Sequence, residues 1–296
     1  MNFRELNGVF AIFLLASFSF LAWAAPSQTP DALSKTVMNS SEKRNVFVEI
    51  GEPPEAWVRR YGKKVEINSK NHGLKFYGLD WTVKNPGQLI VRNRLSEFQL
   101  EAVLGAMGTF DDEYPGEGFS KIVITTNISQ SETIAHDEAR QKIFALLQKI
   151  RSAGWTRWIY PSDPRLSGED AFRYQIAEDD TFYSLDSNYL PPLDVWMKLS
   201  DRSQWKFFLN DVAMSVRFSR DQDRMKPNLP GAYIVWIELI SKNEMERSEF
   251  QGEERKKWKA LYPGARKRQL SIRIEQEKKL QMQGYKIDVE YKNPDQ

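Results

Sequence analysis

The sequence predicts an α+β fold, with antiparallel or mixed sheets that carry helices packed on one face. Three observations favour this class. Short runs of β-branched and aromatic residues, typical of strands, recur between turn signals along most of the chain. One segment near the middle has apolar residues at helical spacing. A similar order of strand, helix, glycine and strand returns in the last third, which indicates two related halves.

Residues 1–24 have the features of a cleavable secretory signal. The run Val9–Trp23 contains no charge, and Ala22 and Ala24 place small residues where a signal peptidase reads the chain. We therefore expect cleavage between Ala24 and Ala25. An uncleaved anchor is the alternative, but a spanning helix needs about 20 apolar residues and this run is shorter. No second run of this kind follows, so we expect no membrane span in the mature chain.

Composition excludes several kinds of chemistry. The chain contains no cysteine, which excludes disulfides, thiolate metal sites and cysteine nucleophiles. Its net charge of +2 indicates neither a nucleic-acid binder nor an acidic tail. No glycine pattern matches a Walker loop or a dinucleotide fingerprint, so we expect no cofactor and no bound metal.

The mature chain divides by composition into a leader and two predicted domains. Residues 25–44 are polar and lack apolar periodicity, as in a flexible leader. An N-terminal α+β domain is expected over 45–190 and a C-terminal α+β domain over 191–296. Pro191-Pro192, within a segment rich in turn residues, is the predicted boundary.

Alternation and turn residues predict the elements of the first part. The predicted strands are 46–50, 63–67, 74–83 and 89–91, with 63–67 and 74–83 joined as a hairpin through Asn71-His72-Gly73. A helix is expected over 53–61, since Pro lies in its first turn and Gly62 follows it. A second helix is expected over 96–107, because Ser96 and Gln99 fit a capping box.

The segment 121–161 has the clearest pattern. A strand at Ile122–Ile124 is followed by Ser129 and Glu132 at capping-box spacing. One apolar helix face then consists of Ala139, Ile143, Leu146, Leu147 and Ile150. Gly154 stands where a glycine ends a helix, and a strand is expected over 155–160.

The second part is predicted in the same way. Strands are expected over 193–199, 204–209, 212–218, 232–240 and 285–291. Helical stretches are expected over 243–262 and 266–283, interrupted by Pro263-Gly264. Because Leu270, Ile272 and Ile274 alternate with polar residues, a strand is the alternative prediction for the start of the second stretch.

Candidate catalytic groups are few. His136 and Glu138 have the H-x-E spacing of zinc deaminases, but that pattern requires cysteines to hold the metal, and a solvated first helical turn is the better interpretation. His72 lies in a predicted turn, and no G-x-S-x-G elbow supports a serine nucleophile. Acidic clusters occur at Asp111-Asp112-Glu113, at Glu178-Asp179-Asp180 and at Asp221 with Asp223. Such clusters usually mark solvated loops, although paired carboxylates could bind a cation or hydrolyse a glycoside.

Aromatic and basic residues are the better candidates for binding. Trp and Arg dominate protein–protein hot spots, because they bury a large area and keep a polar group for hydrogen bonding. The predicted partner-binding residues are Trp57, Arg59, Arg60, Trp155, Arg157, Trp158 and Trp258. The basic runs 255–257 and 266–268 could meet an acidic partner or anionic head groups, although the neighbouring acids also fit a solvated helical surface.

Three features together resemble the periplasmic immunity proteins that neutralise toxins delivered by type VI secretion systems. These features are the signal run 9–24, the helix–Gly–Trp–strand unit 139–160 and the aromatic, charge-mixed last third. The resemblance is one of architecture and composition, and no motif transfers a family residue. It implies a periplasmic, non-enzymatic protein that binds one cognate effector and blocks its active site. An envelope accessory or scaffold protein and a carboxylate-dependent hydrolase remain the alternatives.

Overall fold

The computed structural model describes residues 46–69 and 73–295 and has the predicted α+β architecture, built on one mixed sheet. The predicted signal, the leader and His72 lie outside these residues. The elements in chain order are β1 (Val46–Glu49), α1 (Pro54–Tyr61), β2 (Glu66–Ser69), β3 (Leu74–Asp80), β4 (Gly87–Asn93), β5 (Ser96–Asp111), β6 (Phe119–Thr126), α2 (His136–Ser152), β7 (Thr156–Arg157), α3 (Gly168–Ala177), α4 (Leu193–Lys198), β8 (Gln204–Leu209), β9 (Val212–Arg220), β10 (Tyr233–Ser241), α5 (Lys242–Arg247), α6 (Gly252–Lys256) and α7 (Trp258–Met282). Short 3-10 turns at Gly62–Lys64, Pro115–Glu117 and Gln222–Arg224 complete them.

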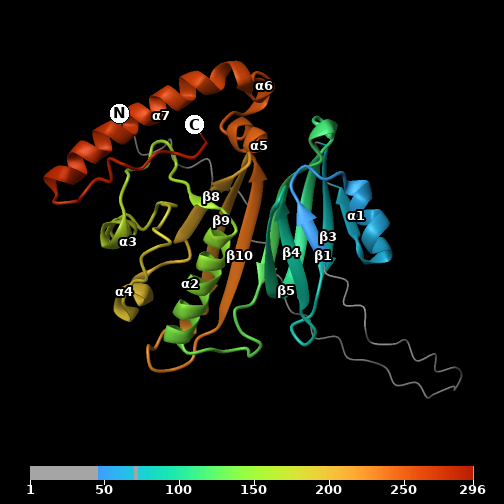
Figure 1. Cartoon of the computed structure of the whole chain (residues 1–296), viewed down its shortest axis with the longest axis horizontal. Helices are drawn as coiled ribbons and strands as arrows, with labels where there is room; N and C mark the ends of the chain where they lie inside the picture. Colours follow the sequence, from blue (N-terminus) through green and yellow to red (C-terminus); the bar gives the residue numbers. More distant parts are fainter. Residues whose placement is uncertain (1–45, 70–72, 296) are drawn as a thin grey trace, which may run out of the picture. The chain divides into compact units, whose positions relative to one another are not determined.

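The sheet runs in the order β1-β4-β5-β6-β10-β9-β8-β7, with the β2–β3 hairpin joined to β5 (Figure 1). β1 and β4 are parallel, and the other strand pairs described are antiparallel. β6 pairs with β10, so strands from both sides of the predicted boundary at 190/191 are neighbours. Residues 44–296 form one compact unit, and that boundary lies inside it.

Most predicted strands are present. The strands expected over 193–199 and 285–291 are absent, and the strand expected over 155–160 is shortened to two residues. Strands at 46–50, 74–83, 89–91, 122–124, 204–209, 212–218 and 232–240 are confirmed within a few residues. The predicted hairpin pairs as expected, although its first strand begins at Glu66, because a 3-10 turn occupies Gly62–Lys64. Residues 285–291 form no strand and make a single bridge, from Ile287 to Leu166. Of the strand expected over 155–160, only Thr156–Arg157 pairs in the sheet.

The helix predicted over 96–107 is wrong, because this segment is the first three quarters of the long strand β5. Ala102 has a positive φ of 56°, and the pairing register shifts between Val103 and Gly105. Phe98 and Leu100 therefore face the core on even positions, and Val103 faces it on an odd position. A bulge of this kind adds one residue to the alternation and so hides the period of two.

α2 has the predicted apolar face, and it packs against the inner face of the sheet. Ala139, Ile143, Leu147 and Ile150 are fully buried in the main core together with residues of β6, β8, β9 and β10. The expected capping box at Ser129 does not form, since the helix begins at His136. Gly154 reverses the chain as predicted, with φ at 92° and the Trp155 amide bonded to the Ile150 carbonyl.

Two helices of the middle segment were not predicted. Residues 193–199 form α4 instead of a strand: Leu193, Val195 and Met197 alternate, but Pro192 caps a helical turn that buries Trp196 completely. α3 lies over Gly168–Ala177, and its first turn carries Glu169 and Asp170. Both are short, and short amphipathic helices carry too few periods to stand out in a sequence.

α7 is one continuous helix through Pro263-Gly264, where an interruption was expected. It includes Leu270–Ile274, so the open alternative of a strand at that point is wrong. A proline in a helix removes one backbone hydrogen bond. Trp258 before this position and Ala265 after it pack in one hydrophobic cluster with Phe250.

Candidate binding surface

One face of the central sheet carries partly exposed side chains over its middle part. The strand registers place Met107 on β5, Val123 on β6, Glu238 on β10 and Ser215 on β9 in one row. A second row contains Thr125, Trp236 and Arg217, and continues to Gln204 on β8. Gln204 is buried, and we call the other residues of these rows, with Ile234, the outer sheet face. Because side chains alternate along a strand, this face lies opposite the one that packs against α2.

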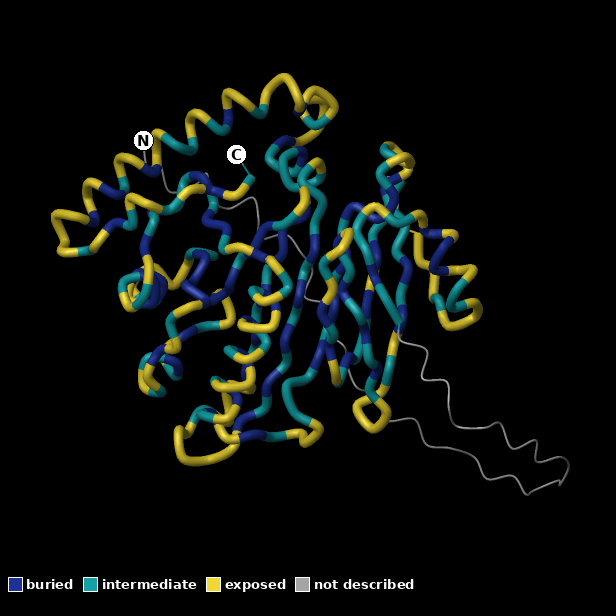
Figure 2. Tube along the Cα trace, viewed as in Figure 1, coloured by how far each residue is buried: buried dark blue, intermediate teal, exposed yellow. Residues whose placement is uncertain are grey.

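β10 shows how the sequence separates the two faces. Its residues Tyr233, Val235, Ile237 and Leu239 are buried in the main core. The intervening Ile234, Trp236, Glu238 and Ile240 are partly exposed, and buried and intermediate residues alternate along the strand in Figure 2. A charged residue in an otherwise apolar strand is consistent with one open face.

Trp236 is the central apolar residue of the outer sheet face. Of the tryptophans that the structure describes, it alone belongs to no hydrophobic cluster. Ile234, Val123 and Met107 also lie outside these clusters, and Met107 is 41% exposed. The surface around Trp236 therefore presents a large aromatic ring beside three aliphatic side chains.

Charged side chains surround this apolar centre. Lys121 and Glu238 form an ion pair of 3.1 Å between β6 and β10. Arg217 lies beside Trp236 in the strand register. An aromatic and an arginine at the centre, with a polar margin, are the composition of protein-binding hot spots.

A polar cluster of Lys206, Tyr160, Asp163 and Glu249 borders the outer sheet face at β8. The Lys206 ammonium lies 5.7 Å from the Trp158 ring centre and 5.6 Å from that of Tyr160. No described residue forms an ion pair with Lys206, and burial lowers its pKa. Burial also raises the pKa of Asp163 to about 6, and it raises the pKa of Glu249, which accepts a hydrogen bond from Tyr160. The cluster thus holds carboxyl groups that protonate more readily than surface acids.

The predicted partner-binding residues of α1 have mainly structural contacts. Trp57 is fully buried, packs 4.7 Å from Phe119 between ring centres, and donates a hydrogen bond from Nε1 to Glu52. Arg60 pairs with the same Glu52 and lies over the Phe47 ring. Arg59 is exposed.

The other predicted partner-binding residues also have contacts within the fold. Trp155, Trp158 and Trp258 are buried in the three separate clusters. Arg157 donates hydrogen bonds to the carbonyl oxygens of Leu166 and Ser184. The structure does not bring the seven residues together on one surface, and their role in binding stays a prediction.

The candidate catalytic residues either have structural contacts or are exposed in loops and turns. His136 is buried and bonded to Tyr233, whereas Glu138 pairs with Lys142 on the helix surface at 3.0 Å. Glu178, Asp179 and Asp180 are exposed in a loop. Asp221 accepts a hydrogen bond from the amide of Asp223 in a short turn.

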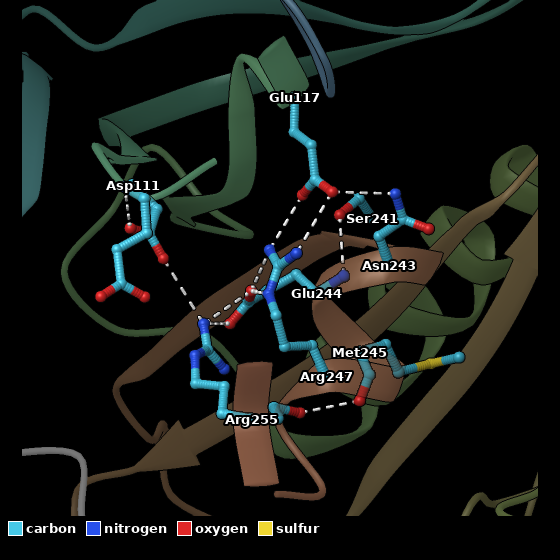
Figure 3. A network of polar contacts seen from close by, with 10 residues as sticks. Asp111, Glu117, Ser241, Asn243, Glu244, Met245, Arg247 and Arg255 are labelled. Carbon is cyan, nitrogen blue, oxygen red and sulfur yellow. Dashed lines mark hydrogen bonds and ion pairs between the residues drawn. The ribbon is translucent and has the colours of Figure 1, made fainter. Parts of the chain in front are cut away.

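Asp111 belongs to an ion-pair network that joins the end of β5 to α5 and α6 (Figure 3). At its centre, the fully buried Arg247 pairs with Glu117 at 2.8 Å and with Glu244 at 2.6 Å. Its guanidinium also lies 3.6 Å from the Tyr114 ring centre. Arg255 pairs with Glu244 at 3.0 Å and with Asp111 at 3.5 Å. Each charge is paired within the network, so it serves to hold two distant parts of the chain together.

Trp236 was missed in the sequence, because 232–240 is an almost entirely apolar run. Arg217, in the separate predicted strand 212–218, was missed as well. Glu238 was the available signal. A single acid within that run indicates that the alternate positions, including Trp236, face outward.

The chain matches no protein-family model, no curated protein and no solved structure. Within residues 46–69 and 73–295, no helix is long and apolar enough to cross a membrane. The same residues contain no group of three or more His, Asp or Glu side chains placed to hold a metal ion.

Proposed function

We propose that this protein is a secreted, periplasmic binding protein that captures one toxic effector and blocks it, as immunity proteins against type VI effectors do. The observation that carries the proposal is the outer sheet face, on which Trp236 is partly exposed and belongs to none of the described hydrophobic clusters. A partly exposed tryptophan among aliphatic side chains, bordered by Arg217 and by the Lys121–Glu238 pair, fits a protein surface. The predicted signal supports the compartment.

The first test is capture of partners from envelope extract by residues 25–296, which contain the whole compact unit 44–296. We expect one stoichiometric toxin-like protein. Trp236→Ala should weaken its binding by about 30-fold or more, because truncating a central aromatic costs about 2 kcal/mol or more. Arg217→Glu, on the same face, should weaken binding as well. The dissociation constants are measured by titration calorimetry.

Leu95→Ala is the matched control, since Leu95 is a fully exposed apolar residue in the turn between β4 and β5. It should bind as the parent does. Unchanged affinity in both Trp236→Ala and Arg217→Glu, with folding intact by circular dichroism, would remove the outer sheet face as the interface. Capture of many envelope proteins without a stoichiometric partner would contradict the immunity function and favour the accessory-protein alternative.

A further inference from the structure

α7 is attached to the rest of the protein through Trp258, Ala265 and Leu280, yet its orientation departs in part from that of the usual amphipathic helix. It buries two charged residues, Arg273 and Glu277, which are each 6% exposed. It leaves Ile272 47%, Ile274 53% and Met282 81% exposed, and these three belong to no hydrophobic cluster. Surface helices of soluble proteins normally turn their apolar side toward the core.

The inner side of α7 is attached by polar contacts, which explains this orientation. The Arg273 guanidinium donates to the carbonyl oxygens of Tyr160 at 2.6 Å and Asp163 at 2.8 Å. Glu277 pairs with Arg165 at 2.7 Å. These contacts fix the rotation of the helix about its axis, and Ile272, Ile274 and Met282 lie on the part of its circumference that remains exposed.

The exposed side of α7 is also strongly basic. From 257 to 282 the exposed charged residues comprise one acid, Glu275, and six bases, namely Lys257, Lys259, Lys267, Arg268, Lys278 and Lys279. Lys267, Arg268, Lys278 and Lys279 form no ion pair with any described residue. The whole chain carries only +2, so this charge is concentrated on one helix. We call Lys267, Arg268, Ile272, Ile274, Lys278, Lys279 and Met282 the outer face of α7.

We propose that the outer face of α7 docks on the surface of a lipid bilayer that contains anionic lipid. Its cations would meet the head groups, and its aliphatic side chains would enter the boundary between head groups and acyl chains. The face covers the exposed half of the helix over about 20 Å of its length, with Ile272 and Ile274 on its two flanks and Glu275 and Met282 between them. The aromatic residues of this helix, Trp258 and Tyr262, pack in a cluster on its inner side, so the outer face lacks the anchors typical of a protein interface. The inference does not rest on the proposed function.

Co-sedimentation with vesicles tests this surface. Residues 25–296 are mixed with vesicles of phosphatidylcholine alone or with added phosphatidylglycerol; omission of 1–24 keeps the apolar run of the predicted signal out of the assay. We expect binding only to the anionic vesicles, with a decrease as salt is added. Each cation neutralised should lower the partition coefficient about fivefold. The variant with Lys267, Arg268, Lys278 and Lys279 all changed to Gln should therefore lower the partition coefficient by about 600-fold.

A matched control removes the same charge from elsewhere on the surface. Lys63, Lys64, Lys84 and Lys226 are exposed, and their joint change to Gln should leave most of the binding intact. Ile274→Ser combined with Met282→Ser should lower the partition coefficient while the salt dependence remains. Equal loss in the two four-site variants would show a non-specific effect of net charge and overturn the proposal. Failure of the parent chain to bind phosphatidylglycerol vesicles would also overturn it.

Discussion

His136 lies at the first position of α2 with its ring enclosed by the protein. It is 1% exposed, and Nδ1 shares a hydrogen bond of 2.6 Å with the Tyr233 hydroxyl. Gly231 passes so close that a Cβ there would lie 2.4 Å from the ring. Burial lowers the pKa of His136, although the nearby carbonyl groups of Arg224 and Lys226 act in the opposite direction.

This environment predicts a loss of stability in mild acid. An unfolded histidine takes up a proton near pH 6.5, whereas the folded His136 takes it up only at lower pH. The unfolded state therefore binds more protons below about pH 6.5, and the free energy of unfolding should fall as pH decreases through this range. Urea unfolding at pH 7.5, 6.5 and 5.5 measures it.

The control is His136→Asn, because other groups titrate in the same range. Asp163, with its pKa raised to about 6, contributes in the opposite direction, since its folded form binds the extra proton. Parent and variant share Asp163, so the difference between their unfolding free energies isolates His136. If that difference does not shrink as pH falls, the pKa of His136 is not depressed in the folded protein.

Arg247 is the second residue with a large predicted effect. Its side chain is fully buried between Glu117 and Glu244, which come from distant parts of the chain. Removing one member of a buried ion pair leaves an uncompensated charge, so Arg247→Ala should lower the free energy of unfolding by about 3–5 kcal/mol.

The comparison variant is Arg94→Ala. Arg94 pairs with Asp211 at 3.4 Å, with side chains 64% and 68% exposed, and such surface pairs contribute at most about 1 kcal/mol. Both variants are measured by urea unfolding at pH 7. Similar small losses in the two proteins would contradict a structural role for the buried network.

At the level of single elements, β5 is the strand that the sequence predicted to be a helix. It also contains a glycine that is closely packed against a neighbouring side chain. Gly108, on its second half, faces Phe119 of β6, and an added Cβ would lie 2.7 Å from the Phe119 ring. Gly108→Ala should therefore destabilise the fold by about 1–3 kcal/mol, the usual cost of overpacking a core.

Gly116→Ala is the matched substitution for this element. A Cβ at Gly116 would meet no atom within 4 Å, and it lies in a 3-10 turn a few residues beyond β5. Thermal unfolding of the two variants should show a lower melting temperature for Gly108→Ala alone. Equal melting temperatures would mean that Phe119 can move aside without cost.

Elements were predictable where one period ran without interruption. The face of α2 from Ala139 to Ile150 repeats over about three turns. β8 and β9 are joined by a turn at Asn210 and Asp211, both with positive φ. The prediction for β5 was wrong because the bulge at Ala102 interrupts the period of two. The prediction for α4 was wrong because the apolar residues Leu193, Val195 and Met197 alternate as in a strand. Local periodicity cannot report a bulge, since the bulge is set by pairing with β4 and β6.

For the whole molecule, the sequence predicted the fold class and not the surface that could bind a partner. Tryptophans next to arginine were expected to mark an interface, yet Trp57, Trp155, Trp158 and Trp258 are buried. Which tryptophan remains exposed depends on which sheet face the helices cover, and that is decided by tertiary packing. Trp236 therefore emerged only from the three-dimensional structure, whereas the basic run 266–268, part of the outer face of α7, was already a candidate for anionic head groups in the sequence.

The pairing of β6 with β10 has a consequence for when the protein can fold. The register joins Lys121 to Ile240 and Thr126 to Val235, so the centre of the sheet closes across more than 100 residues of intervening chain. Contacts this distant in sequence form late and slowly. A nascent chain that has not yet reached residue 241 lacks the strand to which both β6 and β9 must pair. Folding of the whole sheet therefore waits until most of the chain is available.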